Sequence, residues 1–228
     1  MKKINLSILL HLFFLNSFCQ KSESVNISFD VVFKNNPIVL HDSTYNSNDG
    51  NSIKFETLKF YVANIQLYKN EVAVYTEQNS FHLIDVSDTS SQNIFLKAAN
   101  GISFNKIKFN LGIDSTTNVG GAMGGDLDPT KGMYWTWQSG YINFKMEGIC
   151  NTCTDSKKNF EFHLGGYQYP FNPLQKVELK TTANSFKIIL DLRKFFTAVD
   201  LKKQKHIMSP SADAVILSQQ LAKCFSIK

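Results

Sequence analysis

The chain has 228 residues, of which 43% are hydrophobic and 13% aromatic, a globular composition that can fill a sizeable core. Its formal net charge of +5 is modest. The lysine pairs at 157–158 and 202–203 are too small to form a nucleic-acid-binding stripe, so the sequence implies no nucleic-acid partner.

The N-terminus has the pattern of a signal peptide over residues 1–19. Residues 1–3 carry positive charge and residues 4–18 are almost continuously apolar. Ser17 and Cys19 supply the small residues that cleavage before Gln20 requires. The alternative, a lipid anchor on Cys19, is disfavoured because Phe18 stands where that signal has a small residue. Since no later segment approaches about 20 apolar residues, we expect no transmembrane segment. The signal peptide predicts a periplasmic or secreted protein. Residues 20–228 are expected to form one domain.

The remaining chain predicts short strands. In residues 25–33 and 105–113, apolar side chains alternate with polar ones, which is typical of a half-buried strand. Further candidate strands lie at 57–68, 71–77, 81–86, 93–97, 140–147, 159–164, 177–181 and 186–192. About ten strands without alternating helices predict an all-β sandwich or barrel with antiparallel strands, and of the two we expect the antiparallel β-sandwich.

One helix is expected, close to the C-terminus. Ala214, Leu217 and Leu221 recur at helical spacing. Ser209 suits the N-cap and Pro210 the first helical position. The sequence therefore predicts an amphipathic helix over 210–224, laid on the sheets.

Three cysteines remain after the signal peptide, and export would place them in an oxidising compartment. Cys150 and Cys153 form a C-x-x-C motif in a polar turn. Because the chain has no second such motif, we favour a disulfide over half of a metal site or a redox pair. Cys224, at the end of the helical pattern, is expected to be a buried thiol.

Residues 111–148 hold both tryptophans and eight of the twelve glycines. The glycines and the turn-forming pair at 128–129 predict a long, shaped connection over 114–132. After it, the alternation of Met133, Trp135 and Trp137 predicts a strand entrance with both indoles on one face. An ordinary core role for the indoles remains the alternative.

Recognised catalytic motifs are missing from the sequence, so we expect no enzymatic activity. The candidate ligands are imidazoles and thioethers, which suit copper, and Cu(I) in particular. His163 is the best candidate, because it lies opposite the apolar face of its predicted strand together with Glu161. A solvent-facing strand histidine would show the same pattern. The weaker candidates are His82, His206, Met208 and Met133, whereas His41 is expected at the surface.

Calcium is an alternative metal for the glycine-rich connection. Asp114, Asp126 and Asp128 could supply the hard oxygen ligands that calcium prefers, together with loop carbonyls. The complete EF-hand loop pattern is not present in the sequence.

Three motifs carry a family resemblance: GMYWTWQSGYINFKMEG at 132–148, LGIDSTTNV at 111–119 and FEFHLGG at 160–166. They resemble the MbnP-like family, secreted copper-associated proteins of bacteria. Weaker similarity at 55–68, 80–88, 187–192 and 206–227 extends the resemblance over nearly all of the mature chain. The family has a histidine in the motif that contains His163, and the sequence around His82 is similar to a family motif.

The resemblance implies copper binding and a partner, a di-haem cytochrome-c-peroxidase-like enzyme that oxidises a tryptophan to kynurenine. Ring opening exposes an aniline nitrogen and a ketone, which together with His163 could bind copper. Trp135 and Trp137 are the candidates, and we expect Trp135, at the loop-to-strand junction, to be the more accessible. One branch of the family has Asn-His where this chain has Asn118-Val119, so that imidazole is missing here. The alternative function is a structural or interaction module without metal.

Overall fold

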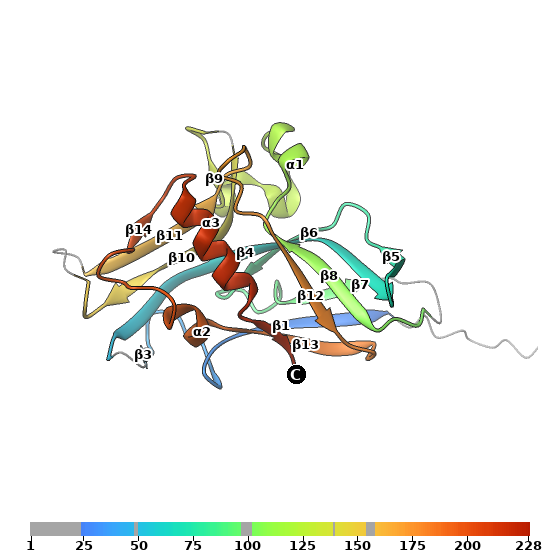
Figure 1. The fold of residues 1–228 in the computed structure, drawn as a ribbon, viewed down its shortest axis with the longest axis horizontal. Coiled ribbons are helices and arrows are strands. Elements are labelled where there is room, and N and C mark those ends of the chain that lie inside the picture. Colours follow the sequence, from blue (N-terminus) through green and yellow to red (C-terminus); the bar gives the residue numbers. More distant parts are fainter. Residues whose placement is uncertain (1–23, 48–49, 97–101, 139, 154–157) are drawn as a thin grey trace, which may run out of the picture.

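A computed structural model of the chain describes residues 24–47, 50–96, 102–138, 140–153 and 158–228 (Figure 1). It contains two β-sheets and few helices, which confirms the predicted all-β sandwich. The expected signal peptide at 1–19, with Ser17 and Cys19, lies outside the described residues. In the part of the chain that is described, no helix has the length and apolar character needed to cross a membrane.

The larger sheet is organised around β4 (Ser52–Lys69), a strand of 18 residues. Its strand order is β12-β8-β4-β10-β11-β14, with β3, β5 and β6 also paired to β4, and β9 paired to β10. The bounds of these strands are β3 Thr44–Asn46, β5 Val72–Thr76, β6 Phe81–Asp85, β8 Lys106–Leu111, β9 Tyr134–Trp135, β10 Gly140–Cys150, β11 Asn159–Gly165, β12 Gln175–Lys180 and β14 His206–Ile207.

The smaller sheet has the order β15-β13-β1-β2, with β7 also paired to β1. Its strands are β1 Val25–Phe33, β2 Asn36–Pro37, β7 Asn93–Leu96, β13 Ser185–Asp191 and β15 Phe225–Ile227. Two pairs depart from the antiparallel pattern, because β1 runs parallel to β13 and β11 parallel to β14. Neither pair is joined by a hairpin, so no tight turn fixes their direction as antiparallel.

The C-terminal helix α3 (Ala212–Ala222) lies within the predicted range but begins later than expected. Ser211, and not Ser209, is its N-cap, and the Ser211 hydroxyl accepts a hydrogen bond from the Ala214 amide at 3.2 Å. Leu217 and Leu221 are buried, as their spacing predicts. Two shorter helices, α1 (Ser115–Val119) and α2 (Leu192–Phe196), escaped prediction because each has only 5 residues, which is too short for a periodic pattern.

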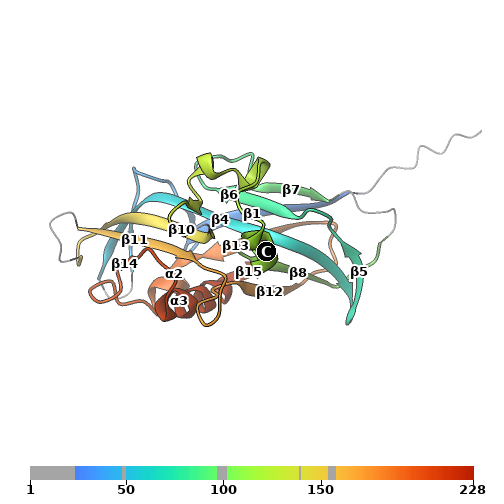
Figure 2. The same ribbon diagram turned by 90° about the horizontal axis from the view of Figure 1, so that it is seen from above.

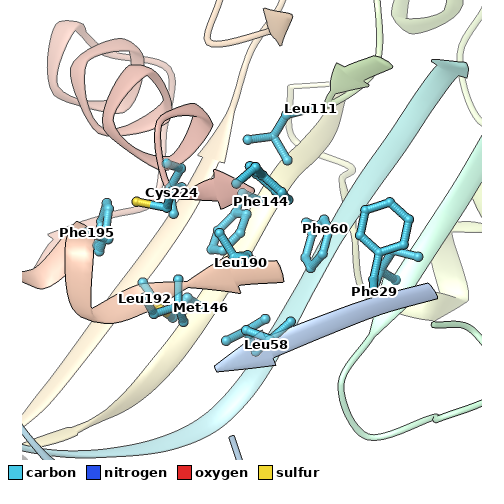
Figure 3. Packing of buried hydrophobic residues seen from close by; sticks show 14 of the residues in the cluster. Phe29, Leu58, Phe60, Leu111, Phe144, Met146, Leu190, Leu192, Phe195 and Cys224 are labelled. Carbon is cyan, nitrogen blue, oxygen red and sulfur yellow. The ribbon is translucent and has the colours of Figure 1, made fainter. Parts of the chain in front are cut away.

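The main core lies between the two sheets and under α3. Phe60 of β4 stacks on Phe144 of β10 at a centroid distance of 5.6 Å and meets the edge of Phe29 from β1 at 6.2 Å (Figure 3). Cys224 is a free thiol in this core, and burial raises its pKa to about 12. Cys150 and Cys153 form the expected disulfide, between β10 and β11.

The opposite face of the larger sheet carries a second, smaller core. In Figure 2, α3 and the yellow-green segment around 125–131 lie on opposite sides of β4. Alternation along β4 explains this arrangement, because Phe60 and Val62 belong to the main core whereas Tyr61 and Ala63 belong to the second. The second core also contains Met133, Trp135 and Tyr141, so the aromatic connection folds back over the sheet.

Candidate functional site

The connection between β8 and β10 is anchored to the larger sheet by buried asparagines. Asn118 of α1 donates to the carbonyls of Ile113 and Asp114 at 3.1 and 2.9 Å, and its side-chain oxygen accepts the Tyr141 amide at 2.8 Å. Asn143 accepts the Ile113 amide at 2.9 Å. Buried amide side chains that satisfy backbone groups in this way fix one conformation of a loop.

The two indoles lie in contact but in different surroundings. Trp135 is in β9 and is 6% exposed, whereas Trp137 lies in the turn after β9 and is 64% exposed. Their ring centroids are 5.5 Å apart. The expectation that Trp135 is the more accessible indole is wrong. The predicted strand alternation ends at Trp135, where the chain turns and the Gln138 amide bonds the Trp135 carbonyl at 3.3 Å.

Trp135 lies against the strand that carries His163. A β-carbon built on Gly165 would come within 2.8 Å of the Trp135 ring, so the indole occupies the space that a side chain at 165 would need. Gly165 is two residues after His163 on β11, and residues two apart in a strand share a face. Trp135 therefore packs on the same face of β11 that carries His163, two residues along the strand.

His163 points away from the main core, as its strand position predicts, but it is only 7% exposed. The alternative, a solvent-facing strand histidine, is wrong, because the imidazole is buried and pairs with Glu147 of β10. His163 Nε2 lies 2.6 Å from a Glu147 carboxylate oxygen. The hydrogen bond from His163, opposed by burial and assisted by Thr57 and Lys145, lowers the pKa of Glu147 to about 2.

The weaker histidine candidates are also paired with glutamates. His82 Nε2 lies 2.9 Å from Glu77 on the half-buried side of β6, and His206 Nδ1 lies 3.2 Å from Glu161 at the exposed edge strand β14. Burial alone would raise the pKa of Glu77, but hydrogen bonds from His82 and Ser80 hold it below its usual value. Three of the predicted ligands thus have carboxylate partners, and the pair at His163 is the shortest and most buried of the three.

The sulfur candidates occupy opposite environments. Met133 is fully buried in the second core, and its backbone carbonyl accepts the Ile142 amide at 2.9 Å. Met208 is 44% exposed in the segment before α3. His41 is exposed, as expected, and has a positive φ of 67°.

The three aspartates of the calcium alternative each have a local partner. Asp114 caps α1 through the Thr117 amide at 2.8 Å, and Asp128 accepts the Thr130 amide at 2.8 Å. Asp126 accepts the Leu83 amide at 3.1 Å and pairs with Lys131 at 2.6 Å. No group of three His, Cys, Asp or Glu side chains arranged to hold a metal is found within the described ranges. The geometry therefore gives the calcium alternative no support.

A cavity of about 400 Å³ lies beside Asp126. It is lined by one candidate copper ligand and one candidate calcium ligand, which are far apart in the sequence. His82 and Asp126 both line it, together with Lys59, Asp85 and Lys131. Lys59 pairs with Asp85 at 2.8 Å and Lys131 with Asp126 at 2.6 Å, so four of the lining charges form ion pairs. The cavity is polar and lies on the β6 side of the larger sheet, where it adds no ligand to His163.

Sequence reasoning missed Glu147 and Gly165. Glu147 alternates with the apolar Met146 in β10, which indicates that it faces away from the main core. Its pairing with His163 depends on the register of β10 against β11, which sets Glu147 opposite Glu161 and Lys145 opposite His163. A single sequence does not reveal such a register.

Comparisons with known proteins agree on one family. The family model described as MbnP matches residues 22–209. The solved structure of MbnP from Methylosinus trichosporium has a similar fold, with a TM-score of 0.59 over 85% of this chain and 86% of that chain, at 15% sequence identity. No curated protein sequence matches the chain.

Proposed function

The chain belongs to the MbnP family, and from this premise we propose that it is a copper-binding protein without enzymatic activity of its own. It acts in the periplasm or outside the cell, after removal of residues 1–19. A di-haem cytochrome-c-peroxidase-like partner oxidises Trp135 with peroxide. Two equivalents of peroxide add two oxygen atoms as the indole C2–C3 bond breaks and are reduced to water, and hydrolysis then releases C2 as formate and leaves kynurenine. The kynurenine completes the copper site with His163. The copper association, the partner and the modification come from the resemblance of the aromatic motif to this family.

One observation carries the choice of residues. The Trp135 ring lies against Gly165, and His163 is two residues away on the same face of β11. A donor created on Trp135 would therefore arise beside an imidazole. Trp137 is exposed at the turn, and its ring contacts the ring of Trp135.

The donor chemistry fits copper. His163 uses Nε2 to bond Glu147, which leaves Nδ1 as the nitrogen for a metal. Histidine ligands commonly bond a carboxylate through the other ring nitrogen, which orients the imidazole and increases its basicity. Bound copper would have imidazole and aniline nitrogens as ligands, and both suit this borderline-soft metal. Glu147 holds the imidazole, and the packed indole side chain holds the second donor beside it.

Co-expression with the native peroxidase tests this proposal. We expect the ring-opened product at Trp135 in the tryptic peptide from Gly132 to Lys145, and a higher Cu(I) affinity in the modified fraction than in the unmodified one. Protein expressed without the peroxidase is the control. A product at Trp137 would reassign the modified residue within the same function. Both indoles intact beside an active peroxidase would reject the proposed maturation.

The alternative is a structural or interaction module without metal. It is favoured by the buried, carboxylate-paired state of His163 and by the lack of a three-ligand cluster among the residues described. The missing imidazole at position 119 points the same way, and Val119 is exposed there on α1. Unmodified tryptophans and the absence of copper binding in the co-expression experiment would select this alternative.

The proposed location predicts a defined covalent state. Mature protein should begin at Gln20, carry no lipid and contain one disulfide, between Cys150 and Cys153. Intact-mass measurement before and after reduction, with alkylation of thiols, checks these three features. A diacylglycerol mass on Cys19, or two alkylated thiols at 150 and 153 without reduction, would contradict the expected state.

A further inference from the structure

The two tryptophans differ in access although their rings are in contact. Trp137 is 64% exposed at the turn, whereas Trp135 is 6% exposed in the second core. The ring centroids are 5.5 Å apart with an interplanar angle of 42°. An oxidant in solution can therefore contact the Trp137 indole, and the Trp137 ring in turn contacts the buried ring of Trp135.

We propose that Trp137 is an electron relay, through which a surface oxidant removes an electron from the buried Trp135. The inference rests on the proposed oxidation of Trp135 by a haem peroxidase. The oxidised haem of that peroxidase would take one electron from the Trp137 indole and would itself be reduced by one electron. An electron from Trp135 then refills Trp137, which returns to its neutral form while the cation radical moves to Trp135. No bond forms or breaks in this transfer, and the indole N–H protons stay in place.

A carboxylate on the same side of the sheet as Trp135 favours a positive radical at that position. Trp135 packs on Gly165 of β11, and His163, two residues earlier on β11, pairs with Glu147 of the neighbouring strand β10. A negative charge close to a forming cation radical stabilises it, and the effect is larger in a buried site than in water.

The neighbouring tyrosines compete poorly for the oxidised state. Tyr134, Tyr141 and Tyr61 form a series of rings with centroid distances of 4.9 and 5.9 Å. Oxidation of a tyrosine near neutral pH requires loss of the phenolic proton. Tyr141 and Tyr61 donate that proton to the backbone carbonyls of Gly121 and Asp126, which are not bases, and burial raises the pKa of both phenols. Tyr141 and Tyr61 are therefore poor acceptors of the oxidised state of the indoles.

A solvent-borne one-electron oxidant tests the relay without the peroxidase. We would use flash-generated ruthenium(III) tris-bipyridine in air-saturated buffer and map oxidation products in the peptide from Gly132 to Lys145. In the wild type, product should accumulate at Trp135. In Trp137→Phe, the Trp135 product should fall by about tenfold, the ratio of the two exposed fractions, while the melting temperature stays unchanged.

Tyr169→Phe is the matched control, since it removes the oxidisable hydroxyl of a ring that is 97% exposed and should leave the yield at Trp135 unchanged. An undiminished Trp135 yield in Trp137→Phe would overturn the relay, and so would wild-type product confined to Trp137. Equal losses in Trp137→Phe and Tyr169→Phe would overturn it as well. Because the oxidant is chemical, these outcomes are independent of whether the peroxidase or copper acts on this protein.

Discussion

Replacing Glu147 by glutamine should lower the free energy of unfolding by about 2 kcal/mol near neutral pH, the usual range for a hydrogen bond to a charged group. The reason is the pairing with His163 at 2.6 Å, in which the histidine side chain is 9% and the glutamate side chain 24% exposed. Glutamine keeps the shape of the side chain and one acceptor oxygen, so the loss of stability measures the contribution of the carboxylate charge. Denaturant unfolding of the two proteins at pH 7 measures it.

The same variant should change how stability depends on pH. The folded pKa of Glu147 is lowered from 4.5 to about 2, so its stabilisation is complete above pH 4.5 and is lost as the pH falls through about 2. A shift of this size corresponds to roughly 3 kcal/mol at 1.36 kcal/mol per unit, and partial exposure to solvent reduces it toward 2. The difference between wild type and Glu147→Gln should therefore shrink below pH 4.5 and vanish near pH 2.

Glu161→Gln is the matched control for this prediction. Glu161 lies directly opposite Glu147 in the register of β10 and β11 and pairs with His206, but at 3.2 Å and with both side chains about one third exposed. Surface pairs of this kind contribute about 0–1 kcal/mol. Parallel stability curves for wild type and Glu147→Gln from pH 7 to pH 2 would contradict the assigned role of the carboxylate.

Regular alternation is what made much of this fold predictable. In β1, the alternation of Val25, Ile27 and Phe29 with polar residues places one face in the core, and the observed strand covers the predicted residues. The helix at the C-terminus followed from the spacing of Leu217 and Leu221. Such local patterns depend only on near neighbours in the chain, and a single sequence displays them.

The second core was not predictable because it depends on pairing between distant segments. The alternation of Met133, Trp135 and Trp137 predicts a continuing strand, but β9 ends at Trp135. The turn after Trp135 belongs to the connection that Asn143 bonds at Ile113 and that Asn118 bonds at Tyr141, and both bonds join residues far apart in the sequence. The close packing of Trp135 on Gly165 joins residues 30 positions apart, and no local pattern encodes it.

The burial of His163 has the same origin. Its strand position correctly places it opposite Phe160, Phe162 and Leu164, which lie in the main core. The opposite face of β11 is also covered, because Glu147 pairs with His163 and Trp135 packs on Gly165. Both contacts join residues that are far apart in the sequence. An exposed strand histidine would tolerate replacement with little loss of stability. The buried pair changes that expectation, and any test of His163 as a ligand must separate copper binding from folding.

His163→Gln provides this separation. The glutamine amide nitrogen can take the place of Nε2 and donate to Glu147, so the pair and the fold are kept, while the nitrogen at Nδ1 is lost. We expect protein matured by the peroxidase to lose Cu(I) affinity by at least about a hundredfold in this variant, since even changes in the residues that support a ligand cost 10–100-fold. Competition with a Cu(I) chelator of known affinity, under reducing conditions, measures the loss.

Two further variants complete the test. His163→Ala should lose copper and also about 2 kcal/mol of stability, because Glu147 is left partly buried without its donor. His82→Gln alters a histidine that is paired with Glu77 in the same manner, and it should retain both copper and stability if His163 is the ligand. Wild-type copper affinity in His163→Gln would remove His163 from the metal site and leave the His163–Glu147 pair with a structural role alone. Loss of copper in His82→Gln with retention in His163→Gln would instead move the site to the cavity lined by His82 and Asp126.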